Sequence, residues 1–425
     1  MENWQHISGT KYSPTCSGKK TENSGDPSGL HGRIMERLDL SRQMSEEEIK
    51  EMIDVEILRD EKARYLDLET KTALRREIFY AIRRLGILQD LINDPGITEI
   101  MVNGTDPVFV EREGRLIQLS VCFETREKLN HVIQQIAADC NRVINEASPI
   151  VDARLKDGSR VNAVLYPVAL NGPILTIRRF PEEAVTMEKL LALGSVNEAA
   201  AGFLKKLVRA GCNILISGGT GCGKTTFLNA LSGLIPREQR VITIEDSAEL
   251  QLQDLPNLVR METRNANVEG CREITIRDLI RTSLRMRPDR LIVGEVRGKE
   301  AVDMLQSINV GHSAMTTVHA NSVRDVASRL ETMVLMGMEL PVSAVRKQIV
   351  SGFDLMIHLG RLRDGSRHVL EIAEPVSGQD GTVALHTLFR FEERGETREG
   401  KVIGELLRTG ELKNNEKLKM AGITE

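Results

Sequence analysis

The sequence lacks several features that would assign it to common classes of protein. No stretch of its 425 residues approaches the ~20 consecutive apolar residues that a membrane-spanning helix needs. The first residues, MENWQHISGTKYSPT, lack the basic and then apolar pattern of an export signal. The six cysteines form no C-x-x-C pair and no cluster with histidine at zinc spacing. We therefore expect a cytoplasmic protein with reduced cysteines, whose association with the inner face of a membrane depends on a partner.

An excess of positive charge is also absent. The chain carries 57 Lys and Arg against 61 Asp and Glu, a formal net charge of −4, so binding of nucleic acid would need a local basic patch. The one candidate patch comprises Arg281, Arg285, Arg287 and Arg290. No aromatic residues alternate with these arginines as a base-stacking surface would require. We therefore expect no strong interaction with nucleic acid, and we expect these arginines at a subunit interface or in solvent.

The length predicts two or three domains, because single domains mostly run ~100–200 residues. Residues 1–30 are rich in Ser, Gly, Thr and Lys with little to bury, which predicts a disordered tail. The remaining boundaries follow from changes in the apolar pattern. They predict a helical module at 31–85, an α/β domain at 86–182, a linker at 183–195, and a C-terminal domain at 196–425 whose final strands begin at about 352.

The two larger domains differ in the arrangement of their apolar runs. The first contains short strand-like runs (ITEIMVNG, PVFVERE, RLIQLS, RVNAVLYPV, ILTIRRF) and one long helix, which indicates an antiparallel α/β domain. The second alternates helical segments with four buried-strand candidates (NILISGG, VITIED, LIVGEV, MTTVHA), which indicates a mostly parallel sheet covered on both faces. Hairpin-like strands (DLMIHLGRL, RHVLEIAEPV, LHTLFRFEE) follow. The predicted fold class is α/β.

A complete phosphate-binding loop occupies residues 218–225. Its sequence, GGTGCGKT, fits G-x-x-x-x-G-K-[ST] at every position, follows an apolar run and opens a helical segment. The glycines allow backbone N–H groups to point at phosphate oxygens, and a helix N-terminus adds partial positive charge. Lys224 is expected to reach the β- and γ-phosphates, and Thr225 to ligate Mg²⁺. The predicted nucleotide-binding residues are Gly218, Gly219, Thr220, Gly221, Cys222, Gly223, Lys224, Thr225 and Thr226.

Carboxylates follow two other predicted strands. The run VITI is followed by Glu245 and, four residues later, by Glu249, and the run LIV is followed by Gly294 and Glu295. Because ligands bind at the carboxyl ends of parallel strands, we expect these acids to converge on the γ-phosphate. Hydrolysis needs one acid to orient the attacking water and another to hold the magnesium shell. The pattern leaves open which acid activates the water.

A histidine also ends a strand-like run. His319 stands at the tip of the segment GHSAMTTVHAN, which begins at Gly311. A single histidine is more often a structural group than a functional one, but the neighbouring motifs favour a role for His319 at the nucleotide. The segment N-K-x-D, which would read guanine, is absent, so we expect ATP as the nucleotide.

Together, four motifs resemble the type II/type IV secretion ATPase superfamily, the GspE/PulE-like proteins. The phosphate loop, the acidic box ITIEDSAEL, the strand LIVGEVRG and the box TTVHANS occur in the order and spacing of that superfamily. Over roughly residues 31–370 the chain is most similar to its CpaF-like branch, the motors of tight-adherence (Flp/Tad) pili. The segments DGSRVNAVLYPVALNGPILTIRRF and LRMRPDRLIVGEVRG carry that likeness.

The resemblance implies a homohexameric, ATP-hydrolysing motor with a RecA-like C-terminal domain and a smaller, PAS-like α/β domain before it. Glu249 matches the glutamate that activates water, Glu295 the acid near magnesium, and His319 the histidine that senses the γ-phosphate. Arg160 and Arg178 match arginine fingers of the N-terminal domain, although each could instead form a surface ion pair. The implied partners are a polytopic inner-membrane platform protein and, indirectly, a pilin or secreted substrate. His312 matches the superfamily less well than His319.

Three alternatives remain open at this stage. Motors of the general secretion and type IVa pilus branches share these boxes, but they usually carry a four-cysteine zinc module that the spacing here does not provide. A conjugation or type IV secretion ATPase is a second alternative. The third is a regulatory scaffold that binds nucleotide without significant turnover, which the intact set of Lys224, Thr225, Glu249 and Glu295 disfavours.

Overall fold

The computed structural model divides the chain into two compact units between residues 181 and 182. It describes residues 33–34, 46–61, 63–83, 87–112, 114–123, 125–140, 142–155, 157–179, 184–264 and 272–424. The predicted tail at 1–30 lies outside these residues. Of the helices that the structure describes, none combines the length and apolar character needed to traverse a lipid bilayer.

The first unit begins with a helical pair, α2 (Glu46–Arg59) and α3 (Leu68–Arg83), joined through the short helix η1 (Ala63–Tyr65). Ile49, Ile53 and Ile57 recur every four residues and therefore lie on one face of α2. They are buried against Leu74 and neighbouring apolar side chains of α3. This shared apolar face makes α2 and α3 a small core of their own.

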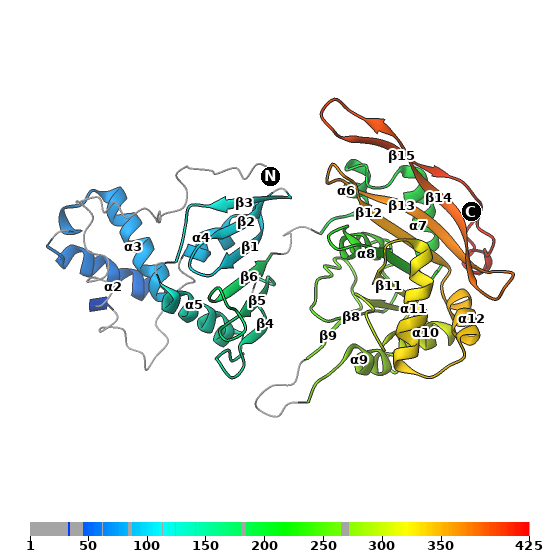
Figure 1. Cartoon of the computed structure of the whole chain (residues 1–425), viewed down its shortest axis with the longest axis horizontal. Helices are drawn as coiled ribbons and strands as arrows, with labels where there is room; N and C mark the ends of the chain where they lie inside the picture. The colour runs from blue at the N-terminus through cyan, green and yellow to red at the C-terminus, as the bar shows by residue number, and fades with distance from the viewer. Residues whose placement is uncertain are drawn as a thin grey trace. The chain divides into compact units, whose positions relative to one another are not determined.

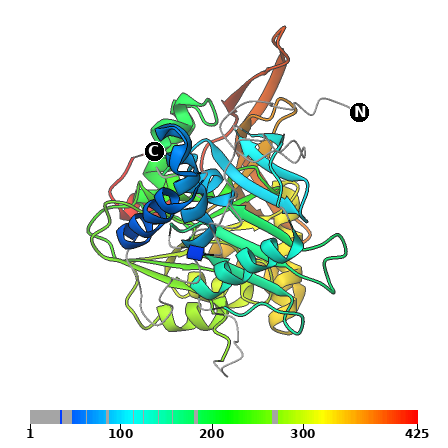
Figure 2. The same ribbon diagram turned by 90° about the vertical axis from the view of Figure 1, so that its left-hand side faces the viewer.

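The rest of the first unit is a six-stranded antiparallel sheet in the order β3-β2-β1-β6-β5-β4. Its elements are α4 (Ile87–Asn93), β1 (Ile97–Asn103), β2 (Val108–Arg112), β3 (Arg115–Leu119), α5 (Arg126–Asp139), β4 (Ile150–Arg154), β5 (Arg160–Val164) and β6 (Ile174–Arg178). Alternate residues of the strands point to one face and pack against α4 and α5 (Figures 1 and 2). The strand β4 was not predicted, because IVDAR is short and partly polar.

The second unit is built on a nine-stranded sheet in the order β15-β14-β13-β12-β7-β11-β10-β8-β9. Its parallel part consists of β7 (Ile214–Gly218), β8 (Val241–Glu245), β9 (Leu258–Glu262), β10 (Arg290–Val293), β11 (Ser313–His319) and β12 (Leu355–Arg361). The predicted mostly parallel sheet is therefore confirmed. It contains two parallel strands more than predicted, β9 and β12.

Helices cover both faces of this parallel sheet (Figure 1). Ile214 and Ile216 of β7 pack on one face with α6 (Met187–Ala192), α7 (Glu198–Arg209) and α8 (Lys224–Ser232). Leu215, between them, packs on the other face with α9 (Ile276–Ser283), α10 (Ala301–Asn309), α11 (Val323–Gly337) and α12 (Val342–Gly352). Burial on both faces explains why the central strands are apolar at successive positions rather than at alternate ones.

Three antiparallel strands, β13 (Arg367–Ser377), β14 (Val383–Glu396) and β15 (Val402–Arg408), extend the sheet beyond β12, and a short helix, α13 (Glu416–Met420), follows. The far ends of β14 and β15 project beyond the helices in both views (Figures 1 and 2). The run DLMIHLGRL was predicted as a hairpin-like strand only. As β12 it forms a hairpin with β13 and also pairs in parallel with β7, because an apolar run shows that a strand is buried but does not identify its neighbour.

Candidate nucleotide and catalytic site

The phosphate loop connects β7 directly to α8. Gly218, Gly221 and Gly223 have φ values of 155°, 71° and 92°, which side chains with a Cβ rarely adopt. At Gly218 a Cβ would also approach the carbonyl oxygen of Leu359 to 2.5 Å. Glycine is thus required there both by the backbone conformation and by the neighbouring strand β12, and the loop opens onto the N-terminus of α8.

Lys224, the first residue of α8, turns back over the loop. Its Nζ donates hydrogen bonds to the carbonyl oxygens of Gly218 (3.1 Å) and Gly219 (2.9 Å) and lies 3.2 Å from Nδ1 of His319. The lysine is 8% exposed, and this burial lowers the pKa of its ammonium group from the usual value. Lys224, the one lysine of the loop, is therefore held in place by two backbone carbonyl oxygens of the loop and by His319.

His319, at the end of β11, connects this lysine to Glu295. Its Nε2 lies 2.9 Å from Oε1 of Glu295. A lysine ammonium can only donate hydrogen bonds, so Nδ1 of His319 must accept, and in the neutral ring the proton resides on Nε2, on the side that faces the carboxylate. Burial, with a smaller contribution from the Lys224 charge, lowers the pKa of His319, which favours this neutral tautomer.

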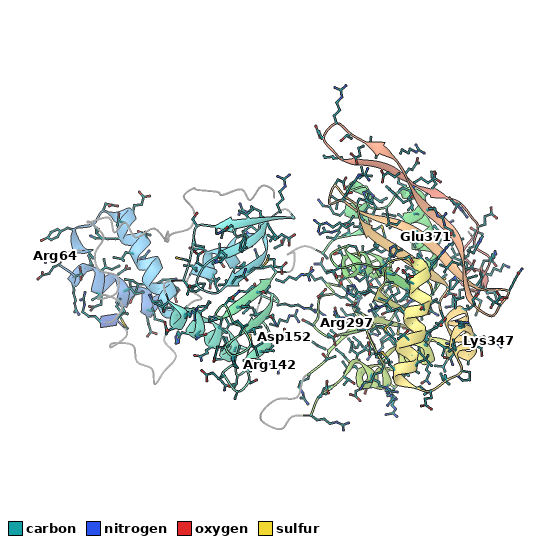
Figure 3. All side chains as sticks on the ribbon, viewed as in Figure 1. Arg64, Arg142, Asp152, Arg297, Lys347 and Glu371 are labelled. Carbon is teal, nitrogen blue, oxygen red and sulfur yellow. The ribbon has the colours of Figure 1, made fainter. Side chains whose placement is uncertain are left out.

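Glu295 is held from its other side by an arginine. Arg297 donates from Nη2 to Oε2 of Glu295 at 2.7 Å, and its Nη1 lies 3.6 Å from Oδ2 of Asp246. The hydrogen bond to Glu295 raises the pKa of the Arg297 guanidinium. Arg297, labelled in Figure 3, lies just beyond the carboxyl end of β10. It lines a groove of about 620 Å³ together with the phosphate loop, His319 and the exposed side of α11.

The acidic box after β8 contains two glutamates with different surroundings. Glu245 is only 3% exposed, and its Oε1 accepts hydrogen bonds from the backbone N–H groups of Glu249 (2.8 Å) and Leu250 (2.9 Å). Burial raises the pKa of Glu245. Glu249 is partly exposed, and its charge acts on Lys224 and Arg297. The buried glutamate thus fixes the backbone from which the more accessible glutamate extends.

Thr225 and Glu295 supply the oxygen donors that Mg²⁺ prefers. Thr225 lies in the first turn of α8, and the Glu295 side chain is 16% exposed. Among the residues that the structure describes, no three or more His, Cys, Asp and Glu side chains gather as a metal site. A magnesium ion bound here would depend on Thr225, on Glu295 and on the phosphates of the nucleotide, a common arrangement for Mg²⁺. Of the remaining predicted positions, Gly219, Thr220 and Cys222 lie in the loop and Thr226 lies in α8.

The two arginines predicted as fingers form a cross-strand pair within the first unit. Arg160 of β5 lies directly opposite Arg178 of β6, and Arg178 lies opposite Glu99 of β1. Directly opposed residues of an antiparallel pair share one face of the sheet. The structure therefore brings the two arginines together, although they are 18 residues apart in sequence.

His312, which matches the superfamily less well than His319, precedes β11 and lies at the opposite end of that strand from His319, with Nδ1 3.2 Å from the carbonyl oxygen of Ser307. One sequence expectation needs correction. Arg290 is 2% exposed rather than at an interface or in solvent, and its side chain bonds Gln239 Oε1 and the Val208 carbonyl. Arg290 begins a buried strand and its long side chain reaches the end of α7, which a count of charges along the sequence cannot show.

Arg297 was not predicted as a site residue, although it follows Glu295 by only two residues.

The chain is similar to several known proteins over most of its length. The family described as type II/IV secretion system protein matches residues 82–374. A putative conjugal transfer protein of Mycobacterium tuberculosis is 36% identical over 331 residues, covering 76% of this chain and 93% of that protein. The type IV secretion system protein VirB11 of Brucella suis is 32% identical over 316 residues, covering 67% and 87%. The structure of the ATPase DotB of Yersinia pseudotuberculosis is similar with a TM-score of 0.50 and 15% identity, covering 67% and 77%, which supports the fold.

Proposed function

Because this chain belongs to the type II/IV secretion system protein family, we propose that it hydrolyses ATP and uses the energy to drive a secretion or pilus machine. The observation that carries this proposal is the connected set of Lys224, His319 and Glu295 at the mouth of a complete phosphate loop. A lysine that neutralises phosphate charge and an acid near the metal are recurring parts of phosphoryl-transfer sites, and here His319 lies between them.

The roles of the individual residues follow from their surroundings. Lys224 exchanges its contacts with the Gly218 and Gly219 carbonyls for the phosphates of ATP. His319 senses the γ-phosphate, because any movement of Lys224 alters the contact at Nδ1 and is passed through Nε2 to Glu295. Mg²⁺, when bound, neutralises charge on the β- and γ-phosphates.

Among the acids, Glu249 is the better candidate for the residue that orients the attacking water. A general base must reach the nucleophile, and Glu249 is partly exposed and close enough for its charge to act on Lys224 and Arg297. Both hydrogen bonds described for Glu245 go to backbone N–H groups within the acidic box, so we assign it the role of holding Glu249 in place.

Arg160 and Arg178 are proposed as arginine fingers. Their shared face brings two positive charges together beside the carboxylate of Glu99, and these charges could neutralise negative charge that develops during phosphoryl transfer. Closure of the first unit over the nucleotide would then couple hydrolysis to movement. We also propose domain boundaries at about residues 86, 182 and 196, on the basis of the changes in the apolar pattern of the sequence.

The machine that we favour is a tight-adherence (Flp/Tad) pilus, assembled by a homohexamer at the inner face of the cytoplasmic membrane. There it would act on a polytopic platform protein and, indirectly, on pilin. A conjugation or type IV secretion ATPase is the second candidate, because the M. tuberculosis relative is named a putative conjugal transfer protein and the Brucella relative a type IV secretion protein.

A combined measurement of turnover and size tests the core of this proposal. We expect magnesium-dependent release of phosphate from ATP, and a particle with six times the 47.4 kDa chain mass in the presence of nucleotide. Light scattering after gel filtration measures the second quantity. A protein that binds ATP but releases no phosphate, even as an assembled ring with its membrane partner, would instead be the regulatory scaffold.

A further inference from the structure

The turn between β12 and β13 lies next to the phosphate loop. The strand β12 pairs in parallel with β7, with Leu359 opposite Gly218, so the segments that follow the two strands emerge at the same edge of the sheet. Arg367, the first residue of β13, donates from Nε to the carbonyl oxygen of Gly221 at 2.8 Å. A Cβ built on Gly223 would lie 3.5 Å from Cδ of Arg367. This arginine therefore forms a hydrogen bond with the phosphate loop at Gly221 and lies close to the loop at Gly223.

The turn that carries Arg367 is itself firmly held. Oδ1 of Asp364 accepts hydrogen bonds from the backbone N–H (2.9 Å) and hydroxyl (2.6 Å) of Ser366, and Oδ2 accepts from the backbone N–H of Val402 (2.9 Å). These bonds lower the pKa of Asp364 to about 2. The carboxylate therefore stays ionised at neutral pH and keeps the turn attached to β15.

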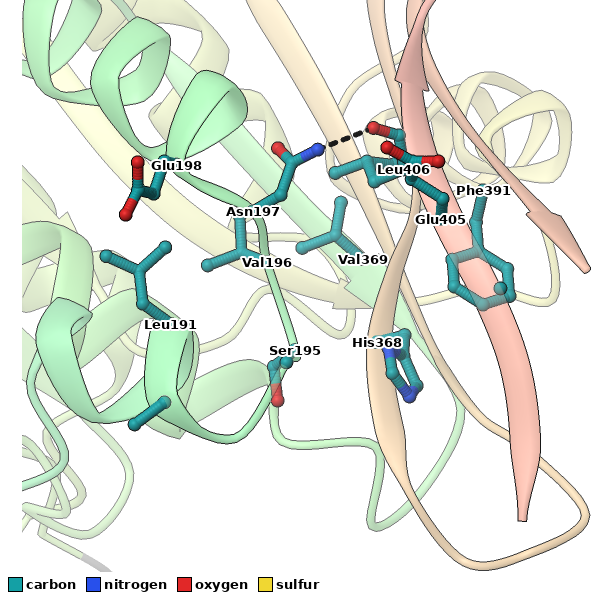
Figure 4. A pocket seen from close by; sticks show the side chains of 13 residues that line it. Leu191, Ser195, Val196, Asn197, Glu198, His368, Val369, Phe391, Glu405 and Leu406 are labelled. Atoms are coloured by element: carbon teal, nitrogen blue, oxygen red, sulfur yellow. Dashed lines mark hydrogen bonds between the residues drawn. The ribbon is translucent and has the colours of Figure 1, made fainter. Parts of the chain in front are cut away.

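The residues after Arg367 are anchored on the other side of the turn. His368 contacts the Ser366 hydroxyl through Nε2 at 3.0 Å, and its ring centroid lies 5.1 Å from that of Phe391. Val369 donates its backbone N–H to the Ser195 carbonyl at 2.9 Å. Figure 4 shows Ser195, His368, Val369 and Phe391 around a pocket between the α6–α7 connection and strands β13–β15. The volume of this pocket is about 500 Å³. Arg367 thus extends from a main chain that is fixed on both sides.

We propose that Arg367 is a positioning residue of the phosphate loop, acting through the hydrogen bond from its Nε to Gly221. This inference rests on the proposed function, since it concerns how the loop grips nucleotide. A loop with four glycines in its first six residues has many accessible conformations. Binding of phosphate requires one of them, in which the N–H groups converge. The hydrogen bond from Arg367 to the carbonyl oxygen of Gly221 favours that conformation before the nucleotide binds. The loop therefore loses less conformational entropy when it binds the nucleotide.

Three substitutions separate the hydrogen bond from the charge. In Arg367→Gln the amide nitrogen is four bonds from Cα, as Nε is in arginine, so the variant keeps the donor and loses the charge. Arg367→Met keeps a stem of similar length without a donor. Arg367→Lys keeps the charge but has a methylene group in place of Nε. The matched control is Arg361→Met, because Arg361 lies directly opposite Arg367 in the same hairpin and is also exposed.

The readouts are the Kd for ADP with magnesium, by calorimetry, and kcat and KM for ATP. We expect Arg367→Met to raise the Kd and KM roughly three- to tenfold, as the loss of one hydrogen bond would, with the melting temperature close to that of the wild type. Arg367→Gln should recover most of the affinity, and Arg367→Lys should resemble Arg367→Met. Arg361→Met should match the wild-type protein.

Two results would overturn the inference. If Arg367→Met binds ADP as tightly as the wild type, the bond to Gly221 has no effect on the loop. If Arg367→Lys restores affinity and Arg367→Gln does not, Arg367 acts by its charge on the nucleotide and not by positioning the loop. Failure of the proposed function is a different outcome, in which the wild-type protein itself shows neither affinity for ADP nor turnover of ATP.

Discussion

Replacing Glu245 and Glu249 in turn by glutamine separates the acid that holds the box in place from the acid that acts on water. In Glu245→Gln the amide oxygen can still accept from the N–H groups of Glu249 and Leu250. A bond to a charged acceptor contributes about 1.5–3 kcal/mol and a bond to a neutral acceptor about 0.5–1.5, so weakening the two bonds costs roughly 2 kcal/mol. Burial disfavours the charged form of Glu245, whose pKa is raised, so removal of the charge offsets part of this cost. For a unit spanning residues 182–425 we therefore expect Tm to fall by less than roughly 8 °C.

The two substitutions should affect kcat in the opposite order to Tm, with the larger loss of kcat in Glu249→Gln. Glu249→Gln removes the carboxylate that we propose orients the water, and we expect kcat to fall by about 10²–10⁴, with ATP binding and Tm unchanged. Glu245→Gln should lower kcat less than about tenfold, because the backbone of Glu249 is still held. Glu245→Ala, which removes the acceptor, should cost more stability than Glu245→Gln.

The assay is steady-state phosphate release at saturating ATP, combined with thermal unfolding of the same samples. One result would refute the reasoning: a loss of turnover in Glu245→Gln as large as that in Glu249→Gln, at an unchanged Tm. In that case Glu245 would itself act on the water, in spite of its burial and its two backbone bonds. Normal turnover in Glu249→Gln would move the role to Glu245 or Glu295.

Three further predictions concern the rest of the site. Lys224→Ala should abolish binding or turnover of ATP, measured by calorimetry and phosphate release, and undiminished activity would contradict the site assignment. Arg160→Ala and Arg178→Ala should each lower kcat by about 10³ or more, as loss of an arginine finger does, while the Kd for nucleotide stays close to that of Arg115→Ala, a control on the same sheet; an equal effect on Kd would exclude fingers. Burial lowers the pKa of His319 below its ordinary 6.5, so the imidazole is neutral above that pH and is protonated only as the pH falls further. The acid limb of kcat/KM should therefore lie below pH 6.5 and be altered in His319→Gln, and a limb above pH 7 would show that another group controls it.

Much of the site could be predicted because its residues are neighbours in sequence. The phosphate loop is a run of eight residues whose chemistry depends on local backbone conformation, and a buried strand before it and a helix after it are visible in the apolar pattern. The acids and His319 stand at the ends of apolar runs, and parallel strands bring such ends to one edge. For these elements, order along the chain is sufficient to predict proximity.

Tertiary structure decided the contacts that depend on which strands are neighbours and on where side chains point. An apolar run carries no mark of its partner, so pairing of β12 with β7, and with it the contact of Arg367 with a glycine 146 residues away, could not be predicted. The pattern of acids left open which of Glu245 and Glu249 acts on the water, and only packing buried one and left the other accessible. The covalent chain fixes how residues that are close in sequence are arranged. The arrangement of residues that are distant in sequence depends on the burial of apolar surface, which many strand orders could provide. The detailed packing of the side chains selects one of these orders.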